Sequence, residues 1–433
     1  MTPTQRVSTS GWTLERSTAH ALDIADPLAR QRSRFHLPIT TDGNPQTYLC
    51  GHSLGLQPKS TAALINEELL VWQSQAVEGH FNNHRPWLSY HQQLTPGLAE
   101  LCGSLPIEVV AMNSLSINLH LLLTSFYRPT AQRHKLLIEA NAFPSDRYAA
   151  ISQLRLHGFD PVEALLELAP REGEDLLRTE DIVGLLEREG QHIATVLLPG
   201  VQYLTGQVLD MNAITRSAQQ QGCVVGFDLA HAIGNVPLKL HEWNVDFAPW
   251  CSYKYLNSGP GSIGGAFVHE RHAHNFNLPR LAGWWGHDKT TRFAMPHEFA
   301  PLPGAEGWQV SNPPILACAP LLASLQIFQD AGIHALRNKS LQLTAYLEYL
   351  LVNLPGRWIE LITPSDPAAR GSQLSLRLRV PTDQARHIHE QLQKQGVVCD
   401  WREPNVIRVT PAPLYNRHVD AWQFVNVLKS LLV

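Results

Sequence analysis

The sequence has no excess of basic side chains, no long apolar run and no cysteine motif. Its 433 residues carry 34 lysines and arginines against 38 aspartates and glutamates, a net charge of -4. This composition gives no support to a nucleic-acid-binding surface. No stretch approaches the roughly 18 consecutive apolar residues of a transmembrane helix, and residues 1–36 contain no apolar segment typical of a secretory signal. We therefore expect a cytoplasmic protein that binds neither nucleic acid nor a membrane.

Cysteine is scarce and scattered. The six residues form no C-x-x-C pair, and they are Cys50, Cys102, Cys223, Cys251, Cys318 and Cys399. This distribution is typical of reduced thiols in the cytoplasm. The segment "HERHAH" (269–274) misses the metalloprotease pattern H-E-x-x-H, because Ala273 stands where the second histidine belongs. We expect this segment to be a solvated loop, and we expect no metal site.

Short apolar runs without alternation dominate the middle of the chain. They are "KLLIEA" (135–140), "IATVLLP" (193–199), "CVVGFD" (223–228), "VDFAPW" (245–250) and "IGGAFVH" (263–269). Such runs indicate strands that are buried on both faces. Helical patterns accompany them, over 57–78 and over 178–190, where Thr179 is placed to cap the first turn. The order of elements predicts an α/β fold with a mainly parallel sheet flanked by helices.

The pattern changes after "SNPPIL" (311–316). A helical stretch (about 315–353) precedes "SQLSLRLRV" (372–380), whose strict alternation predicts an antiparallel strand with one wet face. "NVIRVT" (405–410) is its expected neighbour, and the chain ends in a helical pattern. We expect an N-terminal segment (1–55) packing with the small domain. A large α/β domain (56–320) and a small α+β C-terminal domain (321–433) follow.

Glycines crowd the stretch "CSYKYLNSGPGSIGG" (251–265). Gly259, Gly261 and Gly264 match the dinucleotide pattern G-x-G-x-x-G. A dinucleotide loop must follow a strand directly and open a helix, whereas this one runs into the strand-like "IGGAFV". We interpret it as a compact glycine turn that lets the backbone pass close to a bulky group.

Asp228 and Lys254 each follow a predicted buried strand. Carboxyl ends of neighbouring strands are where open α/β sheets bind ligands. A carboxylate that keeps a pyridine nitrogen protonated, and a lysine that holds an aldehyde, are what pyridoxal phosphate chemistry requires. Taken singly, Asp228 is equally a strand-end cap and Lys254 a surface lysine. His231 either orients Asp228 or is a core histidine.

Several motifs together resemble the kynureninase family. They are "YLCGHSLGLQPKS", "FPSDRYAA", "FDLAHAIGN", "CSYKYLN", "GPGSIGGAFVHERH", "GWWGH", "SNPPIL" and "IRVTPAPLYN", in collinear order from near residue 50 to near 415. The resemblance implies a fold-type I pyridoxal 5'-phosphate enzyme related to class V aminotransferases. It implies cleavage of kynurenine or 3-hydroxykynurenine to anthranilate or 3-hydroxyanthranilate plus L-alanine, within the kynurenine pathway of tryptophan catabolism or NAD biosynthesis. It also implies a homodimer with shared active sites.

The resemblance also assigns cofactor-binding positions. Lys254 would hold the aldehyde, Asp228 would bond the ring nitrogen with Asp146 nearby, and Tyr253 would reach the phosphate and move protons. The remaining cofactor-binding positions are Leu115, Ser116, Phe143, His231, Trp284 and Asn312. Among these, Leu115, Ser116 and Trp284 would bind the phosphate, and Phe143 would stack on the ring. Trp284 and Asn312 would cross to the neighbouring subunit's site.

The substrate positions follow in the same way. Arg408 would clamp the α-carboxylate with Ser53 nearby, while His80 and Asn312 would contact the aromatic ring. His80 with Asn312 resembles family members that favour the 3-hydroxylated substrate. The chain departs from the family at His52, where asparagine is usual, at Ser116, where threonine is common, and at Trp285, where phenylalanine is usual.

Other functions remain as alternatives. A class V aminotransferase or a cysteine desulfurase would use the same fold, but a desulfurase needs a cysteine on a mobile loop. Cys318 and Cys399 lie outside Gly/Ser-rich segments. A zinc hydrolase built on the histidines and an inactive binding scaffold are the remaining two alternatives.

Overall fold

The computed structural model describes residue 7 and residues 9–432, and its largest element is a seven-stranded sheet. The strand order is β2 (Val109–Ala111), β8 (Gly265–Val268), β7 (Phe247–Trp250), β6 (Val224–Asp228), β5 (Ile193–Pro199), β3 (Lys135–Glu139) and β4 (Leu165–Leu168). The strands β4, β3, β5, β6 and β7 pair in parallel, whereas β8 runs antiparallel to both of its neighbours. The predicted mainly parallel sheet is confirmed.

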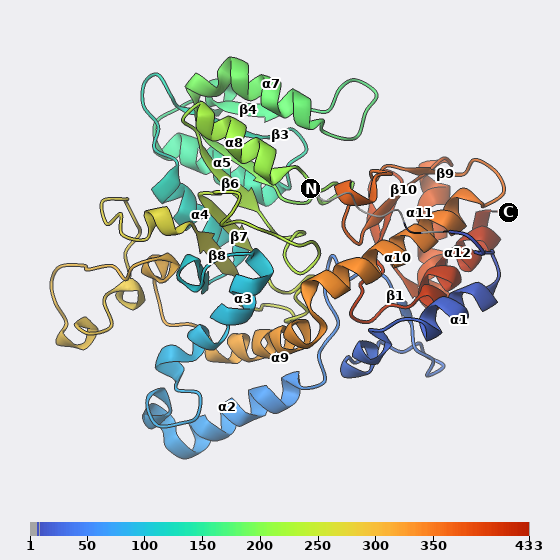
Figure 1. The fold of residues 1–433 in the computed structure, drawn as a ribbon, viewed down its shortest axis with the longest axis horizontal. Coiled ribbons are helices and arrows are strands. Elements are labelled where there is room, and N and C mark those ends of the chain that lie inside the picture. The colour runs from blue at the N-terminus through green and yellow to red at the C-terminus, as the bar shows by residue number, and fades with distance from the viewer. Residues whose placement is uncertain (1–6, 8, 433) are drawn as a thin grey trace.

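Helices cover both faces of this sheet (Figure 1). The helices of this part of the chain are α2 (Thr61–Gln75), α3 (Thr95–Cys102), α4 (Leu115–Phe126), α5 (Pro144–Leu156), α6 (Pro161–Ala164), α7 (Thr179–Glu189), α8 (Met211–Gln220) and α9 (Ile315–Ala331). Among them, α2 lies away from the sheet and packs against α9. Leu137 and Val196 belong to one hydrophobic cluster, while Leu136 and Ile138 belong to another. Adjacent residues of one strand thus enter different cores, which is why these strands are apolar throughout.

The start of α7 differs from the expectation. The helix does begin at Thr179, but its N-cap residue is Arg178, and no side chain caps it among the described residues. The prediction that Thr179 caps the first turn is therefore wrong. Acidic Glu180 and Asp181 occupy that turn instead, where negative charge favours the helix dipole.

The C-terminal part of the chain forms a second, antiparallel sheet. Its order is β12 (Asp400–Arg402), β13 (Val406–Val409), β10 (Leu374–Leu378) and β9 (Ile359–Leu361). The helices packed with it are α10 (Ile333–Val352), α11 (Thr382–Lys394) and α12 (His418–Leu432), and they share a separate hydrophobic core with the sheet. The predicted pairing of the strands at 372–380 and 405–410 is confirmed, as is the smaller C-terminal domain.

The predicted wet face of β10 is only partly present. Ser375 is fully buried, and its hydroxyl donates to the Leu204 carbonyl oxygen of the large domain at 2.6 Å. Arg377 is half-buried and pairs with Asp175. The face expected to meet water meets the large domain instead, which alternation within one strand does not reveal.

The N-terminal segment lies with the C-terminal domain. Helix α1 (Arg16–Ile24) packs along α12, and β1 (Thr47–Tyr48) pairs in parallel with β11 (Val397–Val398), so these N-terminal elements lie with the small domain (Figure 1). The helical stretch predicted over 315–353 is two helices, because Gly332 breaks it with a φ of +75°. The domain boundaries near 55 and 320 stay predictions.

Short 3-10 helices connect the larger elements. They are Ala29–Arg34, Ala76–His80, Trp87–Gln93, Pro106–Glu108, Gly190–His192, Glu270–His272, Trp284–Gly286, Arg292–Ala294, Ala305–Trp308 and Pro367–Ala369. In the part of the chain that the structure describes, no single helix is both long and apolar enough to cross a membrane, and one bent pair, α9 with α10, meets the length and composition together.

Candidate active site

A cavity of about 160 Å³ lies at the carboxyl ends of β5 and β6. It is the position where open parallel sheets bind ligands. Eight sequence-predicted residues line it, namely Leu115, Ser116, Phe143, Asp146, Asp228, His231, Tyr253 and Lys254. The structure therefore brings together residues that are spread over 140 positions of the sequence.

Lys254 lies at the centre of this group. Its Nζ is 3.0 Å from Nε2 of His231 and 5.9 Å from the ring centres of Phe143 and Tyr253. Burial, together with the charge of Lys254, holds the pKa of His231 well below its usual value. His231 is therefore a neutral acceptor for the lysine. Its Nδ1 has no hydrogen-bond partner among the described residues, so the structure shows it beside Lys254 rather than bonded to Asp228.

Two aspartates form a buried acid pair. Asp228 ends β6 and its Oδ1 accepts from the Ala230 amide at 2.6 Å, while Asp146 comes from the first turn of α5. Burial raises the pKa of Asp146 well above its usual range, and the neighbouring Asp228 carboxylate raises it further. Asp146 is therefore the member of the pair that holds a proton more readily, beside the Asp228 carboxylate.

Glu139 is a third buried carboxyl that sequence reasoning missed. It ends β3 and lines the same cavity, where Nε2 of Gln202 donates to it at 3.4 Å. Burial raises the pKa of Glu139 to about 7, opposed by the Gln202 hydrogen bond. The available signal was a carboxylate closing a wholly apolar strand, as Asp228 also does.

The other end of the cavity is the N-terminus of α4. Unpaired backbone N–H groups there favour an anion, and the Ser116 hydroxyl lies 2.6 Å from that of Ser145. Gly264 passes so close that an added Cβ would lie 2.8 Å from the Trp250 carbonyl oxygen and 3.2 Å from the Ser114 carbonyl carbon. The loop leads into β8 and opens no helix, which confirms the interpretation as a glycine turn.

Arg408 lies beside the cavity on β13 and is almost completely buried. Its Nε donates to Oδ1 of Asp400 at 2.8 Å and its Nη1 to the carbonyl oxygen of Tyr203 at 2.6 Å. Tyr203 itself lines the cavity. The Ser53 hydroxyl donates to Asp400 at 2.9 Å, so the predicted substrate residues Ser53 and Arg408 lie side by side.

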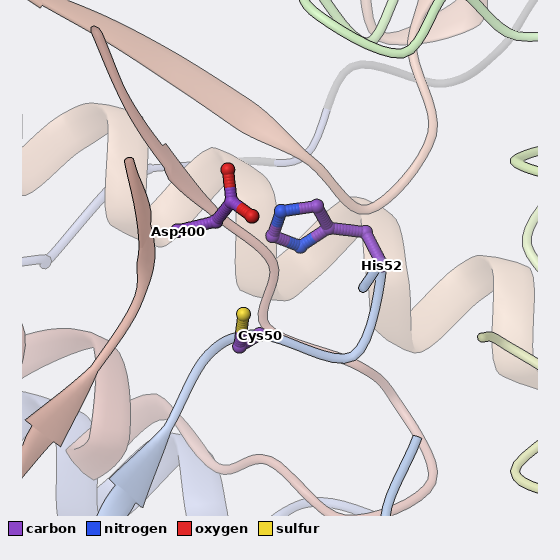
Figure 2. A group of neighbouring side chains, drawn as sticks. All are labelled: Cys50, His52 and Asp400. Atoms are coloured by element: carbon purple, nitrogen blue, oxygen red, sulfur yellow. The ribbon is translucent and has the colours of Figure 1, made fainter. Parts of the chain in front are cut away.

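Figure 2 shows Cys50, His52 and Asp400 converging, and Asp400 is the residue that pairs with this arginine. One ligand atom from each lies within 4.8 Å of the others. His52 is fully buried, which holds its pKa well below normal, and its Nε2 has no hydrogen-bond partner within the described part of the chain. Asp400, however, already pairs with Arg402 and Arg408, and burial raises the pKa of the Cys50 thiol to about 11. Two guanidinium groups and a protonated thiol disfavour a bound cation.

Five predicted site residues do not line the cavity of their own chain. Ser53 and Arg408 lie together beside it, and the other three are His80, Trp284 and Asn312. Nδ1 of His80 lies 3.1 Å from the Val77 carbonyl oxygen, the Trp284 indole donates to the Arg292 carbonyl oxygen at 3.2 Å, and Asn312 is exposed. Trp284 is half-exposed whereas Trp285 is buried. Their predicted roles stay predictions.

The histidine segment after β8 is not the solvated loop that we expected. His269 is buried and lies 3.6 Å from Glu108, whose carboxylate also accepts from His241 at 2.9 Å and from the Glu270 amide at 2.8 Å. The prediction is wrong for His269. The acidic partner Glu108 is more than 150 positions away, so local sequence could not show it.

Comparison with known proteins identifies the family. The family model described as "Kynureninase C-terminal domain" matches residues 336–428. The kynureninase of Koribacter versatilis is 56% identical over 405 residues, covering 94% of this chain and 95% of that one. The kynureninase of Myxococcus xanthus is 55% identical, covering 96% of each chain. The chain belongs to the kynureninase family.

Solved structures extend the likeness to the fold. A C-DES variant with glycine covalently linked to its PLP cofactor superposes with a TM-score of 0.74 at 18% identity, covering 88% of this chain and 96% of that one. The cysteine desulfurase CsdA from Escherichia coli gives 0.75 at 17% identity, covering 94% and 98%. The predicted fold type I is confirmed.

The kynureninase family and this fold confirm pyridoxal 5'-phosphate as the cofactor. The residues present fit it. Buried polar atoms without a partner in the described chain, Oδ1 of Asp146 and Nδ1 of His231, belong to residues that line the cavity. The acid pair suits a protonated ring nitrogen, and the α4 N-terminus suits a phosphate.

Proposed function

We propose that the chain hydrolyses L-kynurenine and 3-hydroxy-L-kynurenine to anthranilate and 3-hydroxyanthranilate, releasing L-alanine. The observation that carries this proposal is the site of Lys254, Asp228 and Arg408 in a chain 56% identical to a kynureninase. In the net reaction, the hydroxyl of water goes to the γ-carbonyl carbon, which becomes the aromatic carboxylic acid. The hydrogen goes to the β-carbon, which becomes the methyl group of alanine.

The cavity residues divide the work of holding the cofactor. Lys254 would hold the aldehyde, Asp228 the ring nitrogen, and the first turn of α4 with Ser116 the phosphate. Bound in this way, pyridoxal phosphate supplies an electron sink for negative charge developing on the substrate. Asp146, whose pKa is raised well above its usual range, would stay protonated and leave Asp228 as the carboxylate opposite the ring nitrogen.

Proton movement falls to groups around Lys254. Once free of the aldehyde, Lys254 would take the proton from the substrate's α-carbon. Neutral His231, 3.0 Å away, accepts a hydrogen bond from the amine and holds it in place. Tyr253 lines the same cavity, and burial raises the pKa of its hydroxyl, so it acts as a proton donor rather than as an anion.

Substrate recognition combines both domains and a second subunit. Arg408 would bind the α-carboxylate from the small domain. His80 and Asn312 would read the 3-hydroxyl, which gives the 3-hydroxylated substrate the higher kcat/KM. Because Asn312 and Trp284 lie outside their own chain's cavity, we place them in the site of a partner within a homodimer.

A cysteine desulfurase or an aminotransferase on the same fold is less well supported. Cys318 and Cys399 are both buried, and burial raises the pKa of the Cys318 thiol to about 12. A thiol in that state does not attack a substrate. An aminotransferase would need a keto-acid acceptor, which kynurenine hydrolysis does not.

Purified holoenzyme should convert kynurenine to anthranilate and alanine with no keto acid added. Lys254→Ala should abolish this turnover and the visible absorbance of bound cofactor, because no other amine lines the cavity as described. The exposed Lys239→Ala is the matched control and should keep both. Anthranilate formation by Lys254→Ala at the wild-type rate, or transamination in place of hydrolysis by the wild type, would overturn the proposal.

A further inference from the structure

We propose that Asp400 is a positioning residue for Arg408, fixing the guanidinium so that its free edge reads the α-carboxylate of the substrate. The inference deepens the proposed function and rests on it. Asp400 is absent from the positions that the sequence resemblance assigns. It emerges only when the strands are paired.

Asp400 and Arg408 are directly opposite each other in neighbouring strands. Asp400 begins β12, and its Cα pairs with that of Arg408 in the antiparallel β12–β13 ladder. Opposite charges at such a cross-strand position attract and limit each other's rotamers. The strand register therefore holds the carboxylate beside the arginine before any ligand arrives.

The hydrogen bonds of Arg408 leave one edge free. A guanidinium has five N–H groups. Nε donates to Oδ1 of Asp400 at 2.8 Å, and Nη2 lies 2.8 Å from the same oxygen. Nη1 donates to the Tyr203 carbonyl oxygen at 2.6 Å. One N–H of Nη1 has no partner among the described residues, and the second N–H of Nη2 makes only a long hydrogen bond of 3.5 Å to the Ser53 hydroxyl. A carboxylate that replaces this long contact can accept from both N–H groups in two parallel hydrogen bonds.

Asp400 also balances the charge around this edge. Arg402 donates to Oδ1 of Asp400 from its Nε at 3.0 Å, so the carboxylate separates two guanidinium groups. The second oxygen accepts from Ser53 at 2.9 Å, and Nη2 of Arg408 is 3.5 Å from the same hydroxyl. Without Asp400, the two arginines would repel each other and Arg408 would lose its orientation.

Surrounding groups do not replace this carboxylate. Figure 2 shows Asp400 directed toward His52 and Cys50. His52 is neutral because burial lowers its pKa, and Cys50 is protonated because burial raises its pKa to about 11. Asp400 is thus the one negative charge among the groups described next to Arg408.

The test compares Asp400→Asn with Glu403→Gln in the holoenzyme. Glu403 follows β12 directly and pairs with the exposed Arg386. Glu403→Gln is therefore a matched control, because it also removes one carboxylate from the same hairpin. Asp400→Asn should raise KM for L-kynurenine by about 10- to 100-fold with a smaller change in kcat, since it loses a charged hydrogen bond of the ground state. Glu403→Gln should keep both constants.

A binding measurement separates this idea from the proposed reaction. L-alanine and ethylamine, which lacks the carboxylate, are titrated into each holoenzyme by calorimetry. Asp400→Asn should weaken the binding of L-alanine about 10- to 100-fold and leave the affinity for ethylamine unchanged. The same loss should not recur when Asp400→Asn is added to Arg408→Gln, because the partner is already gone.

Defined outcomes overturn the assignment. One is an unchanged ratio of L-alanine affinity to ethylamine affinity in Asp400→Asn. The other is that the losses of L-alanine binding free energy in Asp400→Asn and Arg408→Gln add fully in the double variant. If Asp400→Asn fails to fold, Asp400→Glu keeps the charge with one more methylene and should show an intermediate loss for alanine; no loss overturns the proposal. If the wild-type holoenzyme fails to cleave kynurenine, the proposed function is wrong. The L-alanine titration would still show whether Asp400 positions Arg408.

Discussion

Three carboxyl groups are buried at one end of the cavity, and burial is the largest influence on the pKa of each. The pKa values of Asp146 and Asp228 are both raised, and Glu139 has Gln202 as its hydrogen-bond partner. A buried carboxyl resists ionisation because the low-dielectric interior disfavours the charge. Near physiological pH Glu139 is therefore only partly ionised, and Asp146 resists ionisation.

Glu139→Gln should make the cofactor-free protein more stable at high pH. In the native state the pKa of Glu139 is about 7, against 4.5 for the free side chain. The folded form thus binds the proton more tightly, and its stability falls as the pH rises from about 4.5 to 7. Above that window, ionisation of Glu139 lowers the free energy of unfolding by up to about 3 kcal/mol. Glutamine does not ionise, and its side-chain oxygen can still accept the hydrogen bond from Gln202. Thermal unfolding at about pH 5 and about pH 8 measures the difference.

The exposed Glu187→Gln serves as the control for this measurement. It should leave the wild-type pH dependence unchanged. If Glu139→Gln gave the same gain at both pH values, packing rather than ionisation would be responsible, and the argument from burial would be wrong.

At the residue scale, the sequence predicts the site residues that follow apolar strands or lie next to glycines. Asp228 and Lys254 were predicted because each follows a strand and because pyridoxal phosphate chemistry needs both groups. Asp400 and Glu139 were missed, since their significance depends on strand pairing and on burial. His52 was noted as a departure, but its burial against Thr410 required the fold.

At the scale of elements, the glycine turn and the start of α4 form one unit. Gly264 contacts the backbone at Ser114 and Leu115, whereas Gly259 and Gly261 have open space around them and positive φ angles of 84° and 69°. The three glycines of the apparent dinucleotide pattern thus serve two purposes. Two permit the turn, and one permits close approach to the helix that would bind the phosphate.

Gly264→Ala should weaken cofactor binding by about tenfold, because the added methyl would push against the Trp250 carbonyl and the α4 N-terminus. Gly259→Ala is the matched control. It should cost about 1 kcal/mol of stability through its positive φ and leave cofactor affinity unchanged. Titration of the apoenzyme with pyridoxal phosphate gives both affinities. Equal cofactor affinities in the two variants would contradict the idea that the close approach of Gly264 supports phosphate binding.

Elements were predictable where pattern and burial agree. The five apolar runs became five strands, and the alternating run became an antiparallel strand. The expectation of one long helix failed at Gly332, and that of a wet face failed at Ser375. The first failure comes from the positive φ of Gly332, and the second comes from the contact of Ser375 with the large domain, which no local period records.

At the scale of the whole molecule, the proposed site draws on both domains and a second subunit. Lys254 belongs to the large domain, and Arg408 belongs to the small domain, with Tyr203 bonded to it. Asn312 lies outside the cavity of its own chain. The proposal that it completes a partner's site has a specific consequence for mixed dimers.

Asn312→Ala should lower the ratio of kcat/KM for 3-hydroxykynurenine over kynurenine while still cleaving both. Co-assembly of this variant with inactive Lys254→Ala chains should restore the ratio, because the hybrid has one site with an intact lysine and an intact Asn312 from its partner. The ratio is measured on purified hybrid dimers. If the hybrid shows the same kcat/KM ratio as the Asn312→Ala homodimer, Asn312 acts within its own chain, and the proposal of a shared site is wrong.

The pairing of β1 with β11 has a consequence for biosynthesis. Thr47 leaves the ribosome early, but its ladder partner Val397 is made near the end of translation. The large sheet, whose strands all lie between residues 109 and 268, can assemble during synthesis, whereas the other layer must wait. Until then, the apolar side chains of Ala19 and Leu49 lack the C-terminal residues that complete their core.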